Sequence, residues 1–274
     1  MFVAMFSILY PIWYCLIYSF NDGYDAMRGQ LYGLPRKFTF ENYKAIFMIK
    51  GLTEAYAVSI ARTIVGTAVS TFFTAMVAYA FSKKYLIGRR LYVTLGMISL
   101  FFSGGLIPFF MLIRYLHLFD NFWVYIIPVM FNFYYLIIFQ SFFRELPAAI
   151  EESAKIDGAN DFFIFLRLIL PLSKPVLATI ALYVGVFHWN DYFYGVIYIN
   201  NTHLQPIQTF LYRIISQNDV SYFILPPVDA VQRKVTSQSV QYATMIATTL
   251  PIVCVYPFLQ KYFVKGMMIG SVKG

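Results

Sequence analysis

The sequence predicts an all-α membrane protein, and three observations lead to that prediction: composition, hydropathy and the length of the apolar runs. Of the 274 residues, 59% are hydrophobic and 12% are charged, whereas about 25% are charged in a typical soluble chain. The mean hydropathy is +0.63. Apolar residues gather in runs of about 20, the length that an α-helix needs to cross a bilayer. Helices satisfy their own backbone hydrogen bonds in lipid, so these runs favour helices.

Six apolar runs are long enough to serve as transmembrane helices within one transmembrane domain covering residues 1–274. They occupy residues 2–19, 55–81, 91–113, 123–139, 176–198 and 243–258. Ser103, Gly104 and Gly105 interrupt the third run, and Pro251 and Pro257 lie in the sixth. Because proline removes a helical hydrogen bond and glycine weakens a helix, we expect kinks at both places.

The same composition excludes several other protein classes. Cys15 and Cys254 lie inside apolar runs and not at the spacings of a disulfide framework, so we interpret them as small apolar residues. The net charge is +8, but the basic residues are scattered and form no continuous stripe for nucleic acid. No basic segment precedes the first apolar run, so we expect no cleavable signal peptide. We expect a short cytoplasmic segment to precede Met1 in the native protein.

The distribution of Lys and Arg predicts the orientation of the helices. Basic residues are about twice as dense in the connections on one side as on the other, and cytoplasmic connections carry the excess. The connection from Lys83 to Arg90 is the clearest, because four of its eight residues are basic. We therefore place this connection, the loop 145–175 and both termini in the cytoplasm, and the loop 199–241 outside.

The cytoplasmic loop 145–175 has the pattern of two short helices joined by a sharp turn. Pro147 suits the first turn of a helix, and Gly158 can adopt the positive φ that ends one. Asn160 can cap a second helix, which Pro171 would stop. Taken alone, the pattern is also typical of an amphipathic hairpin that buries apolar side chains among lipid headgroups. Those side chains would be Ile150, Ile156, Phe162, Phe163 and Leu166.

The loop also contains a specific motif. Glu152-Ser153-Ala154, then Gly158, then Leu168-x-Leu170-Pro171 resemble the EAA motif of ABC importer permeases at matching spacing. Ser153 replaces an alanine of that motif and Leu168 replaces an isoleucine. Other segments are similar to carbohydrate importer permeases related to the maltose permease, closest to a polysaccharide or lipoprotein-associated subgroup. Together they cover nearly the whole chain, and they are Arg62-Thr63, Gly66-Thr67, Phe102 to Pro108, Trp189-Asn190-Asp191 and Tyr262 to Gly274.

The resemblance implies a permease subunit of a bacterial plasma membrane that works with other chains. It would pair with a second, non-identical permease, dock on two ATP-binding subunits and receive an oligosaccharide from an extracytoplasmic solute-binding protein. ATP and Mg²⁺ would bind to the ATPase subunits, while this chain would hold no cofactor and would not be an enzyme. The fold implied is a six-helix polytopic membrane protein with a cytoplasmic coupling-helix loop.

The resemblance also implies roles for residues of the EAA loop. Glu152 would make a polar contact to the ATPase, Ala154 would keep the packing close, and Gly158 would form the turn. The tail 265–274 resembles one that reaches toward the ATPase in some relatives. The remaining candidates for ATPase coupling are Ser153, Asp157, Ala159, Leu170 and Pro171.

Ionisable residues inside the predicted spans give a second candidate site, because charged groups in a membrane are costly and therefore rare, and those present usually mark a functional site. Arg62 lies in the second span and Asp191 in the fifth, where His188 and Asp191 would share one helical face. A structural alternative is that Arg62 and Asp191 cap helices, pair or reach water at the outer surface. Small residues are expected to pack helices together, and these are Gly66, Thr67 and Ser70.

The functional interpretation of the second site is a polar solute path. Trp189, Tyr192 and Tyr194 would offer flat faces to sugar rings, while Asn190 and Asp191 would form hydrogen bonds to hydroxyl groups. His188 and Arg62 would complete this polar surface. Most other aromatic residues are expected to face lipid or the membrane interface.

No motif for catalysis or metal binding occurs in the sequence. Ser103-Gly104-Gly105 mimics part of the ABC ATPase signature, but no Walker A sequence accompanies it. The three histidines, His117, His188 and His203, are too far apart in the chain to form a zinc motif. In the outer loop, the periodic run from Thr209 to Ile215 predicts a short helix that meets the binding protein or covers the helix ends.

These observations predict a permease subunit of an ATP-driven oligosaccharide importer that works by alternating access. Two alternatives stay open: a permease of the same type for a polyol, a glycerol phosphate or a peptide, and an ion-coupled secondary transporter in which Asp191 titrates. The excess of basic residues suits acidic saccharides such as uronate oligomers, although no pattern places those charges along a path.

Overall fold

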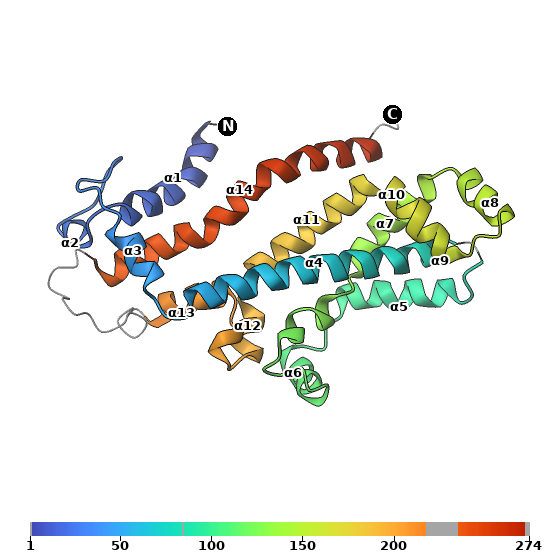
Figure 1. Cartoon of the computed structure of the whole chain (residues 1–274), viewed down its shortest axis with the longest axis horizontal. Coiled ribbons are helices and arrows are strands. Elements are labelled where there is room, and N and C mark those ends of the chain that lie inside the picture. Colours follow the sequence, from blue (N-terminus) through green and yellow to red (C-terminus); the bar gives the residue numbers. More distant parts are fainter. Residues whose placement is uncertain (1, 84, 218–234, 272–274) are drawn as a thin grey trace. The chain divides into compact units, whose positions relative to one another are not determined.

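The computed structural model describes residues 2–83, 85–217 and 235–271, and over these residues the protein is helical (Figure 1). An isolated antiparallel bridge joins Asn21 and Phe38, and no extended strand is present in the described part of the chain. The all-α prediction is therefore confirmed. The chain forms two compact units, named here by their place in the sequence: a terminal unit of residues 1–60 and 190–254, and a central unit of residues 61–189 and 255–274.

The central unit contains the helices that position the candidate sites. In chain order they are most of α4 (Leu52–Ser82), α5 (Arg89–Phe101), α6 (Leu106–Tyr115), the 3-10 turns η1 (Phe122–Tyr125) and η2 (Ile127–Val129), α7 (Phe133–Glu145), α8 (Ala148–Ile156), α9 (Asp161–Ile164), the π-helical turn η3 (Phe165–Ile169), α10 (Leu170–Leu172) and nearly all of α11 (Lys174–Asn190).

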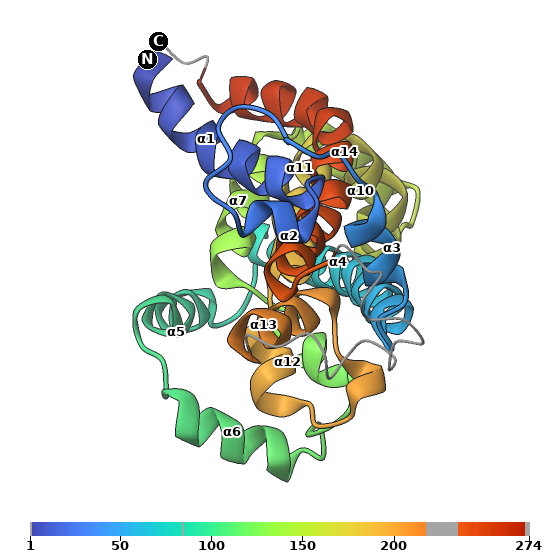
Figure 2. The same ribbon diagram turned by 90° about the vertical axis from the view of Figure 1, so that its left-hand side faces the viewer.

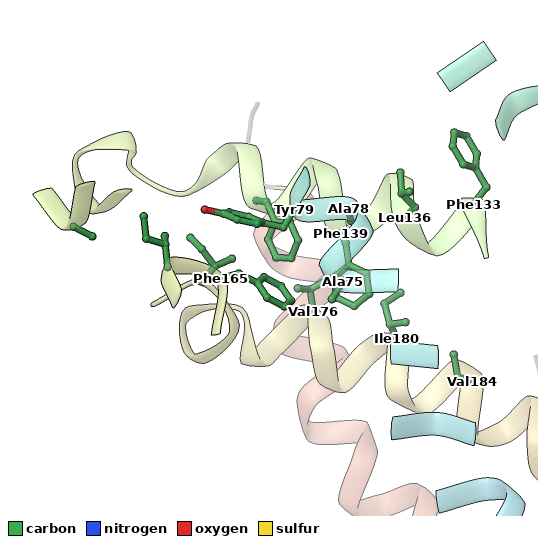
Figure 3. Packing of buried hydrophobic residues seen from close by; sticks show 14 residues of the cluster. Ala75, Ala78, Tyr79, Phe133, Leu136, Phe139, Phe165, Val176, Ile180 and Val184 are labelled. Carbon is green, nitrogen blue, oxygen red and sulfur yellow. The ribbon is translucent and has the colours of Figure 1, made fainter. Parts of the chain in front are cut away.

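A hydrophobic core joins α4, α7 and α11 of the central unit (Figure 3). The α11 residues of this core recur every four positions, which places them on one helical face. They are Val176, Ile180 and Val184. They meet Phe139 of α7 and the small side chain of Ala75 on α4, which lets the helices approach closely.

The terminal unit consists of α1 (Phe2–Ser19), α2 (Gly23–Ala26), α3 (Glu41–Phe47), α12 (Phe193–Tyr198), the 3-10 turn η4 (Thr202–Leu204), α13 (Ile207–Gln217) and the first part of α14 (Ser237–Ser271). Helices α1 and α14 lie side by side (Figure 2), and the ring centroid of Tyr18 is 5.2 Å from that of Tyr242. The segment after α1 is fixed by Asn42, whose amide donates to the carbonyls of Ser19 at 2.9 Å and Asn21 at 2.8 Å.

The predicted spans correspond to helices, and several of them are broken. Among the described residues, α4 alone is long and apolar enough to cross a membrane as one helix. Three bent pairs would raise that number to four if each pair is one span: α5 with α6 at 118°, η1 and η2 with α7 at 52°, and the segment from Asp161 to Leu172 with α11 at 85°. The first span matches α1, and the six-span count stays a prediction.

The break expected in the third span is present. Helix α5 ends at Phe101 and α6 begins at Leu106, and Gly105 between them has a φ of +81°. In the sixth span, α14 continues as one helix through Pro251 and Pro257, so the prolines do not interrupt it. The helix predicted over 209–215 is confirmed as α13, and its outer location stays a prediction.

Two predicted spans are not single continuous helices. The fourth, 123–139, begins with two 3-10 turns, and α7 starts only after Asn132, whose side chain accepts from the amide of Tyr134 at 2.9 Å. The fifth, 176–198, is divided, because α11 ends at Asn190 and α12 begins at Phe193. Asn and Asp side chains compete for backbone hydrogen bonds and disfavour a continuous helix. His188 and Asp191 therefore do not share one helical face, as the sequence had suggested.

Candidate functional site

The EAA motif folds as a hairpin of short helices, residues 147–172, called the EAA hairpin below. Pro147 immediately precedes α8, and Gly158 separates α8 from α9. Asn160 caps α9 by accepting from the amide of Phe163 at 2.8 Å. The second arm continues through a π-helical turn, and Pro171 lies within its last turn, α10, which ends at Leu172. The helix, turn and helix expected from the sequence are confirmed.

Gly158 forms the turn through its backbone conformation. Its φ is +82°, a region that residues with a Cβ rarely adopt. The amide of Ala159 donates to the carbonyl of Ala154 at 2.9 Å, and that of Gly158 to the carbonyl of Lys155 at 3.0 Å. This pair of bonds satisfies the last carbonyls of α8 as a Schellman motif does. Glycine is required here for its φ.

The hairpin buries one side of α8 and exposes the other. Ala154 is buried, whereas Glu152 and Ser153 are exposed. A hollow of about 520 Å³ lies between the two arms. Of the coupling candidates, Ser153, Ala154, Asp157, Gly158 and Ala159 line this hollow. The structure places the remaining three elsewhere: Glu152 on the exposed face, Leu170 half-buried against the core, and Pro171 at the exposed end of the second arm.

The connection between α4 and α5 contacts both arms of the hairpin, which the sequence did not predict. Lys83 forms an ion pair with Glu151 of α8. The hydroxyl of Tyr85 donates to Asp161 of α9 at 2.6 Å, and Lys155 of α8 lies 3.3 Å from the same carboxylate. The basic composition of this connection had been interpreted only as a marker of orientation.

The electrostatics of this region follow from burial and pairing. The hydrogen bond from the Tyr85 hydroxyl lowers the pKa of Asp161, and the Lys155 ammonium lowers that pKa further. Burial lowers the pKa of Lys83, while the Glu151 carboxylate opposes that change. Lys83 is only 8% exposed, so it is a buried cation that depends on its counter-ion.

The second candidate site divides between the two units. In the central unit, Arg62 and His188 are fully buried. The Arg62 guanidinium carbon lies 4.2 Å from the centroid of the Tyr125 ring. Neither ring nitrogen of His188 has a hydrogen-bond partner within the described part of the chain. Its ring packs on Gly66, where an added Cβ would lie 2.4 Å from His188 Nε2.

Small residues bring α4 and α11 together at this place. Gly66 admits the His188 ring, and one turn before His188 a Cβ built on Gly185 would lie 3.3 Å from Thr67 Oγ1. The hydroxyl of Ser70, also on α4, donates to the carbonyl of Val129 at 3.4 Å. Close packing of α4 on α11 at Gly66 and Thr67, as expected from the sequence, is confirmed, whereas Ser70 contacts η2.

The rest of the predicted path lies at the end of α11 and beyond it. Trp189 is buried, Asn190 is exposed and Asp191 is half-buried. In the terminal unit, Tyr192 is exposed, and its ring stacks on that of Tyr212 at 5.0 Å. Tyr194 is half-buried, with its ring 5.3 Å from that of Tyr198.

A cavity that the sequence did not predict lies inside the central unit. Its volume is about 280 Å³. Hydroxyl and amide groups of Ser70, Thr74, Asn132 and Tyr135 line it together with apolar and aromatic side chains. Such a mixture of rings and hydrogen-bonding groups is typical of sites for polar organic ligands. The sequence gives no local pattern for it, since its residues come from four separate elements.

The family model described as binding-protein-dependent transport system inner membrane component matches residues 63–269. The chain belongs to this family. It is therefore an inner-membrane component of a transport system. Among the described residues, no group of three or more His, Cys, Asp or Glu residues is placed to hold a metal ion.

Relatives of this permease match it over almost its whole length. Protein LplC of Bacillus subtilis is 41% identical over 273 residues, which cover 99% of this chain and 91% of that protein. The polygalacturonan/rhamnogalacturonan transport system permease protein YtcP of the same organism is 36% identical over 282 residues, covering 100% and 96%. A chain in the crystal structure of a bacterial ABC transporter involved in the import of the acidic polysaccharide alginate has a TM-score of 0.87 at 30% identity, covering 95% of this chain and 92% of that one.

Proposed function

We propose that this permease is one of two non-identical membrane subunits of an ATP-driven importer that carries oligosaccharides into a bacterial cell. The observation that carries the proposal is the EAA hairpin, in which α8 presents the exposed side chain of Glu152 at the surface of the central unit. Two ATPase subunits would bind ATP and Mg²⁺, and an extracytoplasmic binding protein would deliver the solute. This chain would bind neither nucleotide nor metal.

The physical requirement for coupling supports a role for the hairpin. A partner can shift a permease between conformations only if it contacts the two conformations differently. A short helix with one buried side and one exposed side can be pushed as a unit. In this proposal Glu152 contacts the ATPase, the small side chain of Ala154 allows close packing, and Gly158 fixes the turn. Ser153, Asp157 and Ala159 line the adjoining hollow, and Leu170 and Pro171 end the second arm.

The solute class is inferred from two relatives and from charge. YtcP is named for polygalacturonan and rhamnogalacturonan, and the solved relative belongs to an importer of the acidic polysaccharide alginate. The net charge of +8 suits an acidic oligosaccharide. We infer that Asn190, Asp191, Tyr192 and Tyr194 contact the solute. Arg62, His188 and Trp189 are buried, which favours a packing role for them.

A charge reversal at Glu152 and a backbone change at Gly158 test the proposed function. Glu152→Lys and Gly158→Pro are expected to abolish transport and solute-stimulated ATP hydrolysis. The first reverses the charge of the proposed ATPase contact, and the second prevents the positive φ on which the turn depends. The measurement is transport into proteoliposomes that contain the complete importer, together with copurification of the ATPase. Glu41→Lys, a charge reversal at the start of α3 and outside the hairpin, is the matched control and should keep activity. Normal coupling in either hairpin variant would refute the assignment, as would transport driven by an ion gradient without ATP.

The cytoplasmic location of the hairpin has its own test. Ile156 is 86% exposed, so a cysteine placed there is open to reagents. Ile156→Cys, in a chain whose Cys15 and Cys254 are replaced by alanine, should react with a membrane-impermeant maleimide only from the cytoplasmic side. Labelling of intact cells from outside would contradict the proposed orientation.

A further inference from the structure

The two arms of the EAA hairpin are attached unevenly to the central unit. The second arm is held by apolar burial, since Ile164, Phe165 and Ile169 are each at most 1% exposed. The Phe165 ring stacks 5.5 Å from that of Tyr79, the last buried aromatic residue of α4 (Figure 3). The first arm, α8, buries only Ala154. Because apolar stabilisation scales with buried area, one alanine contributes little to holding α8 in place.

Lys83 supplies the first restraint on α8. It directly follows the last residue of α4, Ser82, and pairs with Glu151 in the first turn of α8. Its ammonium also lies 3.8 Å from the centroid of the Tyr79 ring, which adds a cation–π attraction. The Lys83 side chain is 9% exposed and that of Glu151 is 26% exposed. A pair this far from water is stronger than a surface pair, and loss of one partner leaves a charge uncompensated.

Tyr85 supplies the second restraint, two residues further along the chain. Its hydroxyl donates to Asp161 Oδ2 at 2.6 Å, and Lys155 Nζ lies 3.3 Å from Asp161 Oδ1. The Lys155 ammonium is also 5.0 Å from the centroid of the Tyr85 ring. Asp161 begins α9, and Lys155 lies one turn after Glu151 on α8. Lys83 and Tyr85 therefore bind the two arms from one short segment, and the contacts close into a ring.

We propose that Lys83 and Tyr85 are positioning residues that couple movement of the EAA hairpin to α4. The inference rests on the proposed function of the hairpin as the ATPase contact. Without these contacts α8 can pivot about its apolar second arm, and a push from the ATPase is absorbed locally. With them, the push reaches the end of α4, the helix that alone in the described part is long and apolar enough to cross a membrane (Figure 1).

A double-mutant cycle on Lys83 and Glu151 tests the proposal. The variants are Lys83→Gln, Glu151→Gln and the double variant, each in the complete importer reconstituted in proteoliposomes. The quantity measured is solute transported per ATP hydrolysed. Each single variant should lower this ratio about five-fold, the lower end of typical coupling effects. The double variant should lower it no further, because both changes remove the same contact.

A conservative variant and a matched control complete the cycle. Lys83→Arg keeps the charge and should retain most of the ratio, which a loss of folding alone would not explain. Lys44→Gln removes an exposed ion pair of similar chemistry, since Lys44 lies 2.7 Å from Glu41, and should leave the ratio unchanged. An unchanged ratio in Lys83→Gln, or losses that add in the double variant, would overturn the proposal.

Tyr85→Phe tests the other half of the ring and remains informative if Lys83 variants fail to insert. It removes one hydroxyl and keeps the aromatic ring, so the ratio should fall by about two-fold, in line with loss of one hydrogen bond. The ATPase should copurify with Tyr85→Phe and Lys83→Gln as with the wild type. Loss of the ATPase from these variants would overturn the positioning role alone, whereas its retention by Gly158→Pro would overturn the proposed function.

Discussion

The contact between α4 and α11 and the turn of the EAA hairpin both depend on a glycine, but for different physical reasons. Gly66 lies inside a helix, where an added Cβ would meet the ring of His188 at 2.4 Å. Gly158 has a φ of +82°, and an added Cβ there would meet nothing within 4 Å. Gly66 is therefore required for the space it leaves, and Gly158 for its backbone conformation.

The difference extends to how each region is stabilised. Around Gly66, close packing of buried groups leaves no room, and even the His188 ring nitrogens lack hydrogen-bond partners in the described residues. Around Gly158, side chains are exposed, and ion pairs and hydrogen bonds fix the arms. A region built by packing resists deformation, whereas one built by a few polar contacts can be moved as a unit by a partner.

Filling the space at Gly66 should have the largest effect on stability. Gly66→Ala forces α4 and α11 apart, and overpacking of this kind costs about 1–3 kcal/mol. The measurement is the thermal unfolding midpoint of the purified permease in detergent. In a His188→Ala background the same substitution should cost much less, because the ring that it meets is gone.

Gly104→Ala is the matched control for Gly66. A Cβ at Gly104 would lie 3.9 Å from Pro108, an ordinary van der Waals contact, so its unfolding midpoint should stay close to that of the wild type. Equal midpoints for Gly66→Ala and the wild type would contradict the assigned close contact.

Substitution at Gly158 should have a smaller effect on global stability and a specific effect on ATPase binding. Compared with glycine, an alanine in the left-handed region costs about 1–2 kcal/mol. This cost lowers the population of the turn conformation roughly 5- to 30-fold. Asparagine tolerates this region better, so Gly158→Asn should lose less affinity for the ATPase than Gly158→Ala. The measurement is the ATPase concentration needed for half-maximal stimulated hydrolysis. Equal values for alanine, asparagine and glycine would show that φ at this position does not limit binding.

Local sequence patterns predicted the turn at Gly158 but not the partner of Gly66. A glycine that follows one helix and precedes the Asn cap of the next predicts a turn from fewer than ten residues of sequence. The spacing of the EAA motif supported the same prediction. The small residues of α4 predicted close packing, but His188 lies more than a hundred residues away, and no periodicity indicates which side chain fills the space. The same limit applied to Lys83 and Glu151, 68 residues apart, and to the cavity lined by Ser70 and Asn132. The break after Asn190 was missed because hydropathy continues across it.

The smallest expected effect concerns the polar contacts of the hairpin and depends on pH. The pKa of Asp161 is lowered in the folded protein, first by the Tyr85 hydroxyl and then by Lys155, with Lys83 adding to it. A carboxyl with a lowered folded pKa stabilises the fold above its unfolded pKa of about 3.9, and that contribution is lost as the pH falls through the folded value. Asp161 is largely exposed, so solvent screening keeps the contribution small.

Asp161→Asn should therefore lower the unfolding midpoint slightly near neutral pH, and the difference from the wild type should vanish as the pH falls below about 4. Asp157→Asn, a change of the same chemistry at an exposed residue of the same hairpin with no ion pair among the described residues, is the control and should show a smaller difference at neutral pH. The difference between Asp161→Asn and the wild type is expected to arise from ionisation of the carboxyl. A difference that persists or grows on acidification would mean that the Asp161 side chain acts through packing, as the residues around Gly66 do. The hairpin would then not differ from the region around Gly66 in how it is stabilised.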